Sequence, residues 1–139
     1  MATQVFVYGT LMRGERNHHW MRGAKFIGGA VTAPRFSLWS LGAYPVICPS
    51  GRTQVLGEVF RLTDAHLRRL DILEEYPRFY HRRREPTRFG PAWIYYQSNP
   101  PPQSRFLPGG NWRRRTLRPL SRNGFAGVEA VQGRQRDLC

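Results

Sequence analysis

Short apolar segments, interrupted every few positions by glycine, proline or polar residues, constrain the fold of this chain more than any other feature. Such segments are typical of β-strands, and an alternation of apolar and polar positions supports this reading. Seven segments predict strands: residues 4–8, 24–31, 34–41, 44–48, 55–62, 79–85 and 91–97. Of these, 44–48 and 55–62 are expected to pair with each other around a turn at Pro49 to Gly51.

A single segment, residues 64–75, has the spacing of apolar residues that indicates a helix. Thr63 is the expected N-cap, and Asp64 lies in the first turn, where the helix dipole favours an acid. Pro77 is expected to end the helix. Many short strands with one helix predict a small α+β domain with a curled or barrel-like sheet.

The length of 139 residues is that of one domain. No apolar run approaches the ~20 residues that a membrane-spanning helix needs, and the N-terminus lacks the pattern of a signal peptide. The two cysteines, Cys48 and Cys139, provide neither a disulfide framework nor the spacing of metal ligands. We therefore expect a cytoplasmic protein with no membrane partner and no metal site.

The chain is strongly basic, with 22 Lys and Arg residues, 9 Asp and Glu residues and a formal net charge of +13. Residues 113–139 alone contain 7 arginines and 2 acidic residues. This composition predicts a domain over residues 1–112 and an arginine-rich C-terminal extension over 113–139, loosely attached or partly disordered. The charge is compatible with nucleic-acid binding or with a general bias towards arginine, and no base-reading module is evident.

Glu74 breaks the pattern of the predicted helix. Projected at ~100° per residue, it lies about 40° from the centre of the face that three leucines form. Asp71 lies about 100° away and Glu75 about 140° away in the same projection. Burying a carboxylate is costly unless it is paired or neutralised. The residue therefore forms an ion pair with one of the many arginines, or it is a carboxyl of raised pKa that can transfer protons.

The sequence Tyr8-Gly9-Thr10-Leu11 directly follows the first predicted strand. A glycine here allows a sharp turn and leaves backbone N–H groups available to an anion or an oxyanion. Alone the motif is also compatible with an ordinary turn between two elements. The chain has none of the patterns GxxxxGK[ST], GxGxxG or GxSxG, so no nucleotide cofactor or serine nucleophile is expected.

Taken together, these segments resemble the γ-glutamylcyclotransferase-like family, which includes γ-glutamylamine cyclotransferases and AIG2-like proteins. The order and spacing of the matching segments hold from residue 5 to about residue 112. The segments are Val7-Tyr8-Gly9-Thr10-Leu11, Gly14 with Asn17-His18, Gly42-Ala43-Tyr44-Pro45, Gly57-Glu58-Val59-Phe60, Leu70-Asp71-Ile72-Leu73-Glu74, Pro77 with Tyr80 and Arg82, and Ala92-Trp93-Ile94-Tyr95.

The resemblance implies a small mixed β-barrel with flanking helices and a cavity that the turn at residues 8–11 closes at one end. It also implies an enzyme that cuts a γ-glutamyl amide, a small-molecule substrate, without a cofactor. The α-amine of the glutamyl group would attack its own γ-carbonyl, which releases 5-oxoproline and a free amine. Glu74 would be the general acid and base. The expected substrate-binding residues are Tyr8, Gly9, Thr10, Leu11, Tyr80 and Arg82.

Two alternatives remain open at this point. The chain could use the same fold as a non-catalytic module that binds a small ligand or a protein. It could also bind nucleic acid through its arginines, in which case affinity would fall steeply with salt. An inward-facing carboxyl favours the enzyme, whereas the arginine-rich extension favours the nucleic-acid binder.

Overall fold

The computed structural model describes residues 2–115. Most of the predicted extension therefore lies outside the described residues, although Arg113 to Arg115 pack against the domain. In chain order the elements are β1 (Ala2–Val7), η1 (His18–Met21), β2 (Lys25–Val31), β3 (Phe36–Ser40), β4 (Pro45–Thr53), β5 (Leu56–Thr63), α1 (Asp64–Leu73), β6 (His81–Glu85), β7 (Ala92–Tyr96), β8 (Arg105–Phe106) and η2 (Trp112–Arg114), where η denotes a 3-10 helix.

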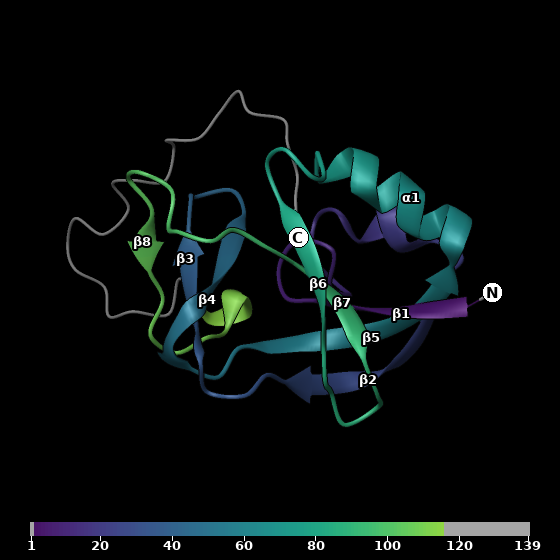
Figure 1. Cartoon of the computed structure of the whole chain (residues 1–139), viewed down its shortest axis with the longest axis horizontal. Coiled ribbons are helices and arrows are strands. Elements are labelled where there is room, and N and C mark those ends of the chain that lie inside the picture. The colour runs from purple at the N-terminus through teal and green to yellow at the C-terminus, as the bar shows by residue number, and fades with distance from the viewer. Residues whose placement is uncertain (1, 116–139) are drawn as a thin grey trace.

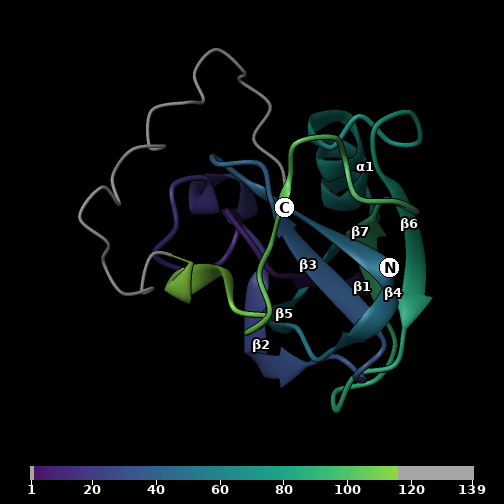
Figure 2. The same ribbon diagram turned by 90° about the vertical axis from the view of Figure 1, so that its left-hand side faces the viewer.

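The strands form two sheets (Figures 1 and 2). A five-stranded sheet has the order β2-β5-β1-β7-β6, and a three-stranded sheet has the order β4-β3-β8. The central strand β1 runs antiparallel to β5 and parallel to β7. Three consecutive residues of β1, Val5, Phe6 and Val7, are buried, so both faces of this strand contribute to the core.

All seven predicted strands exist, but the predicted pairing of 44–48 with 55–62 is wrong. The strand β4 is longer than predicted, continues through Pro49 to Gly51, and pairs with β3. The strand β5 belongs to the other sheet, where β1 and β2 occupy its two edges. With both edges of β5 already paired, no edge remains for β4.

The predicted barrel is also wrong, because the two sheets of residues 2–115 do not close on each other. Where β4 approaches β7, isolated hydrogen bonds replace a strand ladder. The Gln97 N–H donates to the carbonyl of Ile47 at 3.1 Å. The Ile47 N–H donates to the Tyr8 hydroxyl at 3.2 Å, and that hydroxyl donates to the Tyr95 carbonyl at 2.8 Å. The phenol of Tyr8 thus connects β4 of one sheet with β7 of the other through its hydroxyl.

The described residues contain one α-helix rather than several flanking helices, and α1 packs against β5 and β1. Its N-terminus is the predicted one, because the Thr63 hydroxyl accepts a hydrogen bond from the His66 N–H at 3.0 Å. Leu67 and Leu70 are buried and attach the helix to the sheet. No helix among residues 2–115 is long and apolar enough to span a membrane.

Candidate active site

Glu74 is the C-cap of α1, one residue beyond the last helical position. The helix ends two residues earlier than predicted, in two closing hydrogen bonds. The Glu75 N–H donates to the Ile72 carbonyl at 3.1 Å, and the Tyr76 N–H donates to the Asp71 carbonyl at 2.9 Å. These are the two bonds of a Schellman motif, and they require the left-handed φ of 55° that Glu75 adopts. The motif therefore fixes the place at which the Glu74 side chain leaves the helix.

The burial of the three acids agrees with the helical projection. Glu74 is 0% exposed, Asp71 is half-buried and Glu75 is exposed. A fully buried carboxyl is uncommon in a small domain, because desolvation disfavours its charged form. This part of the prediction, an inward-facing Glu74 beside an outward-facing Glu75, is confirmed.

Residues 8–11 form a buried turn after β1. Tyr8, Thr10 and Leu11 are at most 1% exposed, and Gly9 is buried as well. The Met12 N–H donates to the Gly9 carbonyl at 3.1 Å and closes the turn. The next two carbonyls are also occupied. That of Thr10 accepts from the Asn17 N–H at 3.0 Å, and that of Leu11 lies 2.9 Å from Nδ1 of His18.

The backbone N–H groups of the same turn differ from its carbonyls. Among residues 2–115, no group accepts a hydrogen bond from the N–H of Gly9 or of Leu11. Buried backbone donors without an acceptor are rare in native proteins, because each costs the free energy of its desolvation. The turn therefore offers buried donors of the kind that stabilise an anion or an oxyanion.

Glu58 of β5 anchors the loop that follows this turn. Its Oε1 accepts from the Arg13 N–H at 2.8 Å, and its Oε2 accepts from Arg13 Nε and from a guanidinium nitrogen of Arg113, each at 3.2 Å. The Glu58 side chain is only 5% exposed, and the Arg13 guanidinium also stacks 3.6 Å from the centre of the Phe26 ring. A buried carboxylate with three donors on it holds the loop firmly to the sheet.

Three tyrosines connect the turn to the rest of the predicted site. The Tyr8 hydroxyl donates to the Tyr95 carbonyl, and the Tyr80 hydroxyl donates to the Pro45 carbonyl at 2.7 Å. The rings of Tyr80 and Tyr95 meet edge to face, with centroids 6.4 Å apart. All three side chains are buried. The structure thus brings Tyr8 and Tyr80 together through Tyr95, a residue that was not predicted as part of the site.

Arg82 was predicted to line the cavity, and its guanidinium forms an ion pair with Asp71 of α1. Nε lies 2.7 Å from Asp71 Oδ1, and a terminal nitrogen lies 3.1 Å from Oδ2. The Tyr95 hydroxyl donates to the same Oδ1 at 2.7 Å. Burial lowers the pKa of Arg82, but its hydrogen bond with Asp71 and the charge of Asp71 outweigh that effect, so the net pKa is raised.

Comparison with known proteins places this chain in a family. A family model described as gamma-glutamyl cyclotransferase, AIG2-like, matches residues 5–114. The chain belongs to this family. A protein of Vibrio cholerae is 40% identical over 115 residues, which are 83% of this chain and 99% of the relative. The gamma-glutamylcyclotransferase family protein YtfP of Escherichia coli K12 is 36% identical over 109 residues, which are 78% of this chain and 95% of the relative.

The crystal structure of an AIG2-like protein from Mus musculus has the same fold as this γ-glutamyl cyclotransferase family member. The two superpose with a TM-score of 0.65 at 28% identity, over 73% of this chain and 81% of the mouse chain. The predicted family resemblance is therefore confirmed, and the fold of the family is present here as two open sheets with one helix.

Two members of the site, Glu58 and Tyr95, were not predicted. The signal for Glu58 is an acid among the apolar positions of residues 55–62, the same kind of exception that singles out Glu74. The signal for Tyr95 is weaker, because tyrosine fits the alternation of a β-strand equally well.

Among residues 2–115, no three His, Cys, Asp or Glu side chains gather closely enough to hold a metal ion.

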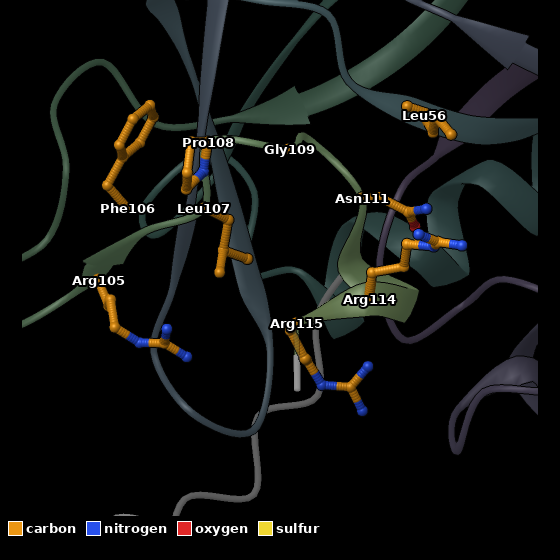
Figure 3. Close-up of a pocket in the computed structure, with 9 residues that line it drawn as sticks. All are labelled: Leu56, Arg105, Phe106, Leu107, Pro108, Gly109, Asn111, Arg114 and Arg115. Atoms are coloured by element: carbon orange, nitrogen blue, oxygen red, sulfur yellow. The ribbon is translucent and has the colours of Figure 1, made fainter. Parts of the chain in front are cut away.

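A groove of about 850 Å³ lies away from the predicted site residues, between the start of β5 and the segment from β8 to η2 (Figure 3). Its wall combines apolar side chains with arginines: Leu56, Arg105, Phe106, Leu107, Pro108, Gly109, Asn111, Arg114 and Arg115. Within the described part of the chain, Arg105 and Arg114 have no acidic partner, and Arg115 pairs with Glu15 at 3.8 Å. Burial lowers the pKa of Arg115. The groove therefore has a net positive charge.

Proposed function

We propose that this chain is a γ-glutamylcyclotransferase that releases 5-oxoproline and a free amine from a γ-glutamyl amide. The observation that carries the proposal is the fully buried Glu74 carboxyl in a member of this family. A protein that only binds its ligand gains nothing from a buried proton-transfer group, whereas an enzyme that moves protons does.

The reaction asks little of the protein besides shape and proton transfer. The nucleophile, the α-amine, and the electrophile, the γ-carbonyl, belong to one molecule, so holding the glutamyl chain in a folded conformation supplies much of the rate. The neutral α-amine attacks the carbonyl carbon, a C–N bond forms, and the attacking nitrogen loses a proton to the Glu74 carboxylate. Glu74 then donates that proton to the leaving nitrogen as the original amide C–N bond breaks.

The reaction also needs hydrogen-bond donors for an oxyanion, and we assign this role to the turn at residues 8–11. The tetrahedral intermediate bears a negative oxygen, and the N–H groups of Gly9 and Leu11 are buried donors that no group of residues 2–115 engages. We propose that these two N–H groups donate hydrogen bonds to the oxyanion. Thr10 lies between them in the same turn. Tyr8 and Tyr80 shape the wall around the glutamyl group. Arg82 acts through Asp71, because its guanidinium is committed to that carboxylate.

A screen of γ-glutamyl amides and peptides for 5-oxoproline release tests the proposal. The expected result is turnover of at least one substrate, with equal amounts of 5-oxoproline and free amine. Binding of 5-oxoproline without turnover of any γ-glutamyl amide would instead support the non-catalytic module on the same fold. Neither binding nor turnover would contradict both readings of the site.

The arginine-lined groove favours a second candidate function, the binding of a polyanion such as nucleic acid. Arg82 and Arg83 of β6 are less available to a polyanion, because they already form ion pairs with Asp71 and Glu85. For this function, the double variant R105A/R114A should weaken binding of single-stranded DNA and flatten its salt dependence. R68A/R69A, on the exposed side of α1, is the matched control. Equal losses in both variants would indicate attraction by net charge alone.

A further inference from the structure

Asn17 carries a buried donor that the described part of the chain does not use. The residue is 6% exposed, and its side-chain Nδ2 has no hydrogen-bond partner among residues 2–115. Its backbone is fixed beside the turn, because its N–H donates to the Thr10 carbonyl at 3.0 Å and its carbonyl accepts from the Trp20 N–H at 3.0 Å. A buried, unpaired amide nitrogen costs free energy that a bound acceptor would recover.

Other polar groups around this loop have partners, which makes Asn17 an exception. His18 contacts the Leu11 carbonyl through Nδ1, and Arg13 is held by Glu58 and by the Phe26 ring. At the turn itself, the buried donors left over are the N–H groups of Gly9 and Leu11 and the Asn17 amide. The other two buried side-chain donors without a partner among residues 2–115, Nε1 of Trp112 and Nε2 of Gln97, lie on η2 and directly after β7. The groups at the turn donate and do not accept, so the ligand they fit presents oxygen atoms.

We propose that Nδ2 of Asn17 donates a hydrogen bond to the α-carboxylate of the γ-glutamyl group. This inference rests on the proposed function. The glutamyl end of any such substrate presents two kinds of oxygen to the protein: the γ-carbonyl that becomes the oxyanion, and the α-carboxylate. The backbone N–H groups of the turn serve the first, and the Asn17 amide is the remaining donor for the second.

A neutral amide also suits the chemistry better than a guanidinium would. An arginine bound to the α-carboxylate would bring a positive charge close to the acid/base carboxyl and favour its ionised form. It would also favour the neutral α-amine, but it would make the Glu74 carboxylate a weaker base and so slow removal of the proton from the attacking nitrogen. Asn17 recognises the carboxylate without changing the charge of the site.

The test compares ligands with and without the α-carboxylate. The binding pair is 5-oxoproline and 2-pyrrolidinone, titrated by NMR, and the substrate pair is a γ-glutamyl amide and the 4-aminobutanoyl amide of the same amine. The variants are Asn17→Ala, which removes the amide, and Asn17→Asp, which keeps its shape and its acceptor but loses the donor. Asn99→Ala, on an exposed loop, is the control.

We expect Asn17→Ala to weaken 5-oxoproline binding ~10- to 100-fold, as for loss of a hydrogen bond to a charged group. Asn17→Asp should weaken it at least as much, because two carboxylates then face each other. Both variants should change 2-pyrrolidinone binding by less than about twofold, and kcat/KM should fall for the γ-glutamyl amide alone. Asn99→Ala should resemble the wild type.

Two results would overturn the inference. Equal weakening of both ligands would show that Asn17 only shapes the loop, and full 5-oxoproline affinity in Asn17→Asp would show that the donor is not used. In either case a wild type that still binds 5-oxoproline and turns over γ-glutamyl amides leaves the proposed function standing. A wild type that binds neither lactam and turns over no γ-glutamyl amide would overturn both proposals.

Discussion

Asp71 and Arg82 form a two-point ion pair between the last turn of α1 and the edge strand β6, with contacts of 2.7 and 3.1 Å. Both side chains are mostly buried, and the Tyr95 hydroxyl adds a hydrogen bond to the same carboxylate. Asp71 precedes Glu74 by three residues, one helical turn. The pair therefore attaches the end of the helix that carries the proposed acid/base to the strands behind it.

Asp71→Asn should lower the free energy of unfolding by about 2 kcal/mol, because it leaves the Arg82 guanidinium poorly paired in a mostly buried place. Urea unfolding measures the change. Arg69→Gln, on the exposed side of the same helix, should stay within ~0.5 kcal/mol of the wild type. A loss for Asp71→Asn no larger than that of this control would contradict a structural role for the pair.

Gly57→Ala should destabilise the protein by about 2 kcal/mol or more. A Cβ at this position would lie 2.5 Å from Cζ of Phe6 and even closer to the Val7 carbonyl, directly before the turn at residues 8–11. Gly29→Ala is the matched control on the neighbouring strand, because its Cβ would meet only the Gly57 carbonyl at 3.8 Å. Thermal unfolding of the two variants should differ clearly, and equal melting temperatures would contradict the close packing of β5 on β1.

Features of the fold that depend on residues close in sequence could be predicted, and those that depend on distant residues could not. The helical period alone placed Glu74 inward and Glu75 outward, since both positions follow from the geometry of one element. The pairing of β4 and β5 could not be predicted in the same way. Which edge of a strand is free depends on residues far along the chain, here β1 and β2.

The candidate site also combines features that are local in sequence with features that depend on distant residues. The turn at residues 8–11 has a local signature, a glycine after a buried strand, and was predicted. The commitment of Arg82 to Asp71 and of Arg13 to Glu58 depends on which acid the fold places nearby, and the chain has more arginines than acids to choose from. The unpaired amide of Asn17 is defined by the absence of a neighbour, which a sequence does not show.

The stability of the protein should depend on whether residues 113–115 are present. A protein that ends at Arg115 keeps the contacts of Arg113 with Glu58 and with the Arg13 carbonyl, whereas one that ends at Trp112 loses them. The shorter protein should be less stable by ~1–3 kcal/mol, because the buried Glu58 carboxylate loses a charged donor. Urea unfolding of both proteins measures the difference. Equal stability would place the end of the domain at residue 112, as the sequence predicted.

The Cys48 thiol should be unreactive in the folded protein. Burial raises the pKa of this thiol to about 11, so little reactive thiolate is present near neutral pH. In a Cys139→Ser variant, iodoacetamide at about pH 8 should modify the unfolded chain and spare the folded one. Because the folded pKa is raised, the contribution of Cys48 to stability is complete below about pH 9 and is lost as the pH rises towards 11. Rapid native alkylation would contradict this burial.

The comparison of Glu74→Gln with Glu75→Gln tests the central claim most directly. Both variants replace one carboxyl with an amide of the same shape, and they differ in that Glu74 is buried and Glu75 is exposed. The measurement is kcat for 5-oxoproline release from a γ-glutamyl amide that the wild type turns over, with urea unfolding to show that both variants are folded. Glu74→Gln should lower kcat by ~10²- to 10⁴-fold, because proton transfer is lost, and Glu75→Gln should keep most of the wild-type rate. Wild-type turnover by folded Glu74→Gln, or loss of activity in Glu75→Gln alone, would contradict the assignment of Glu74 as the acid/base.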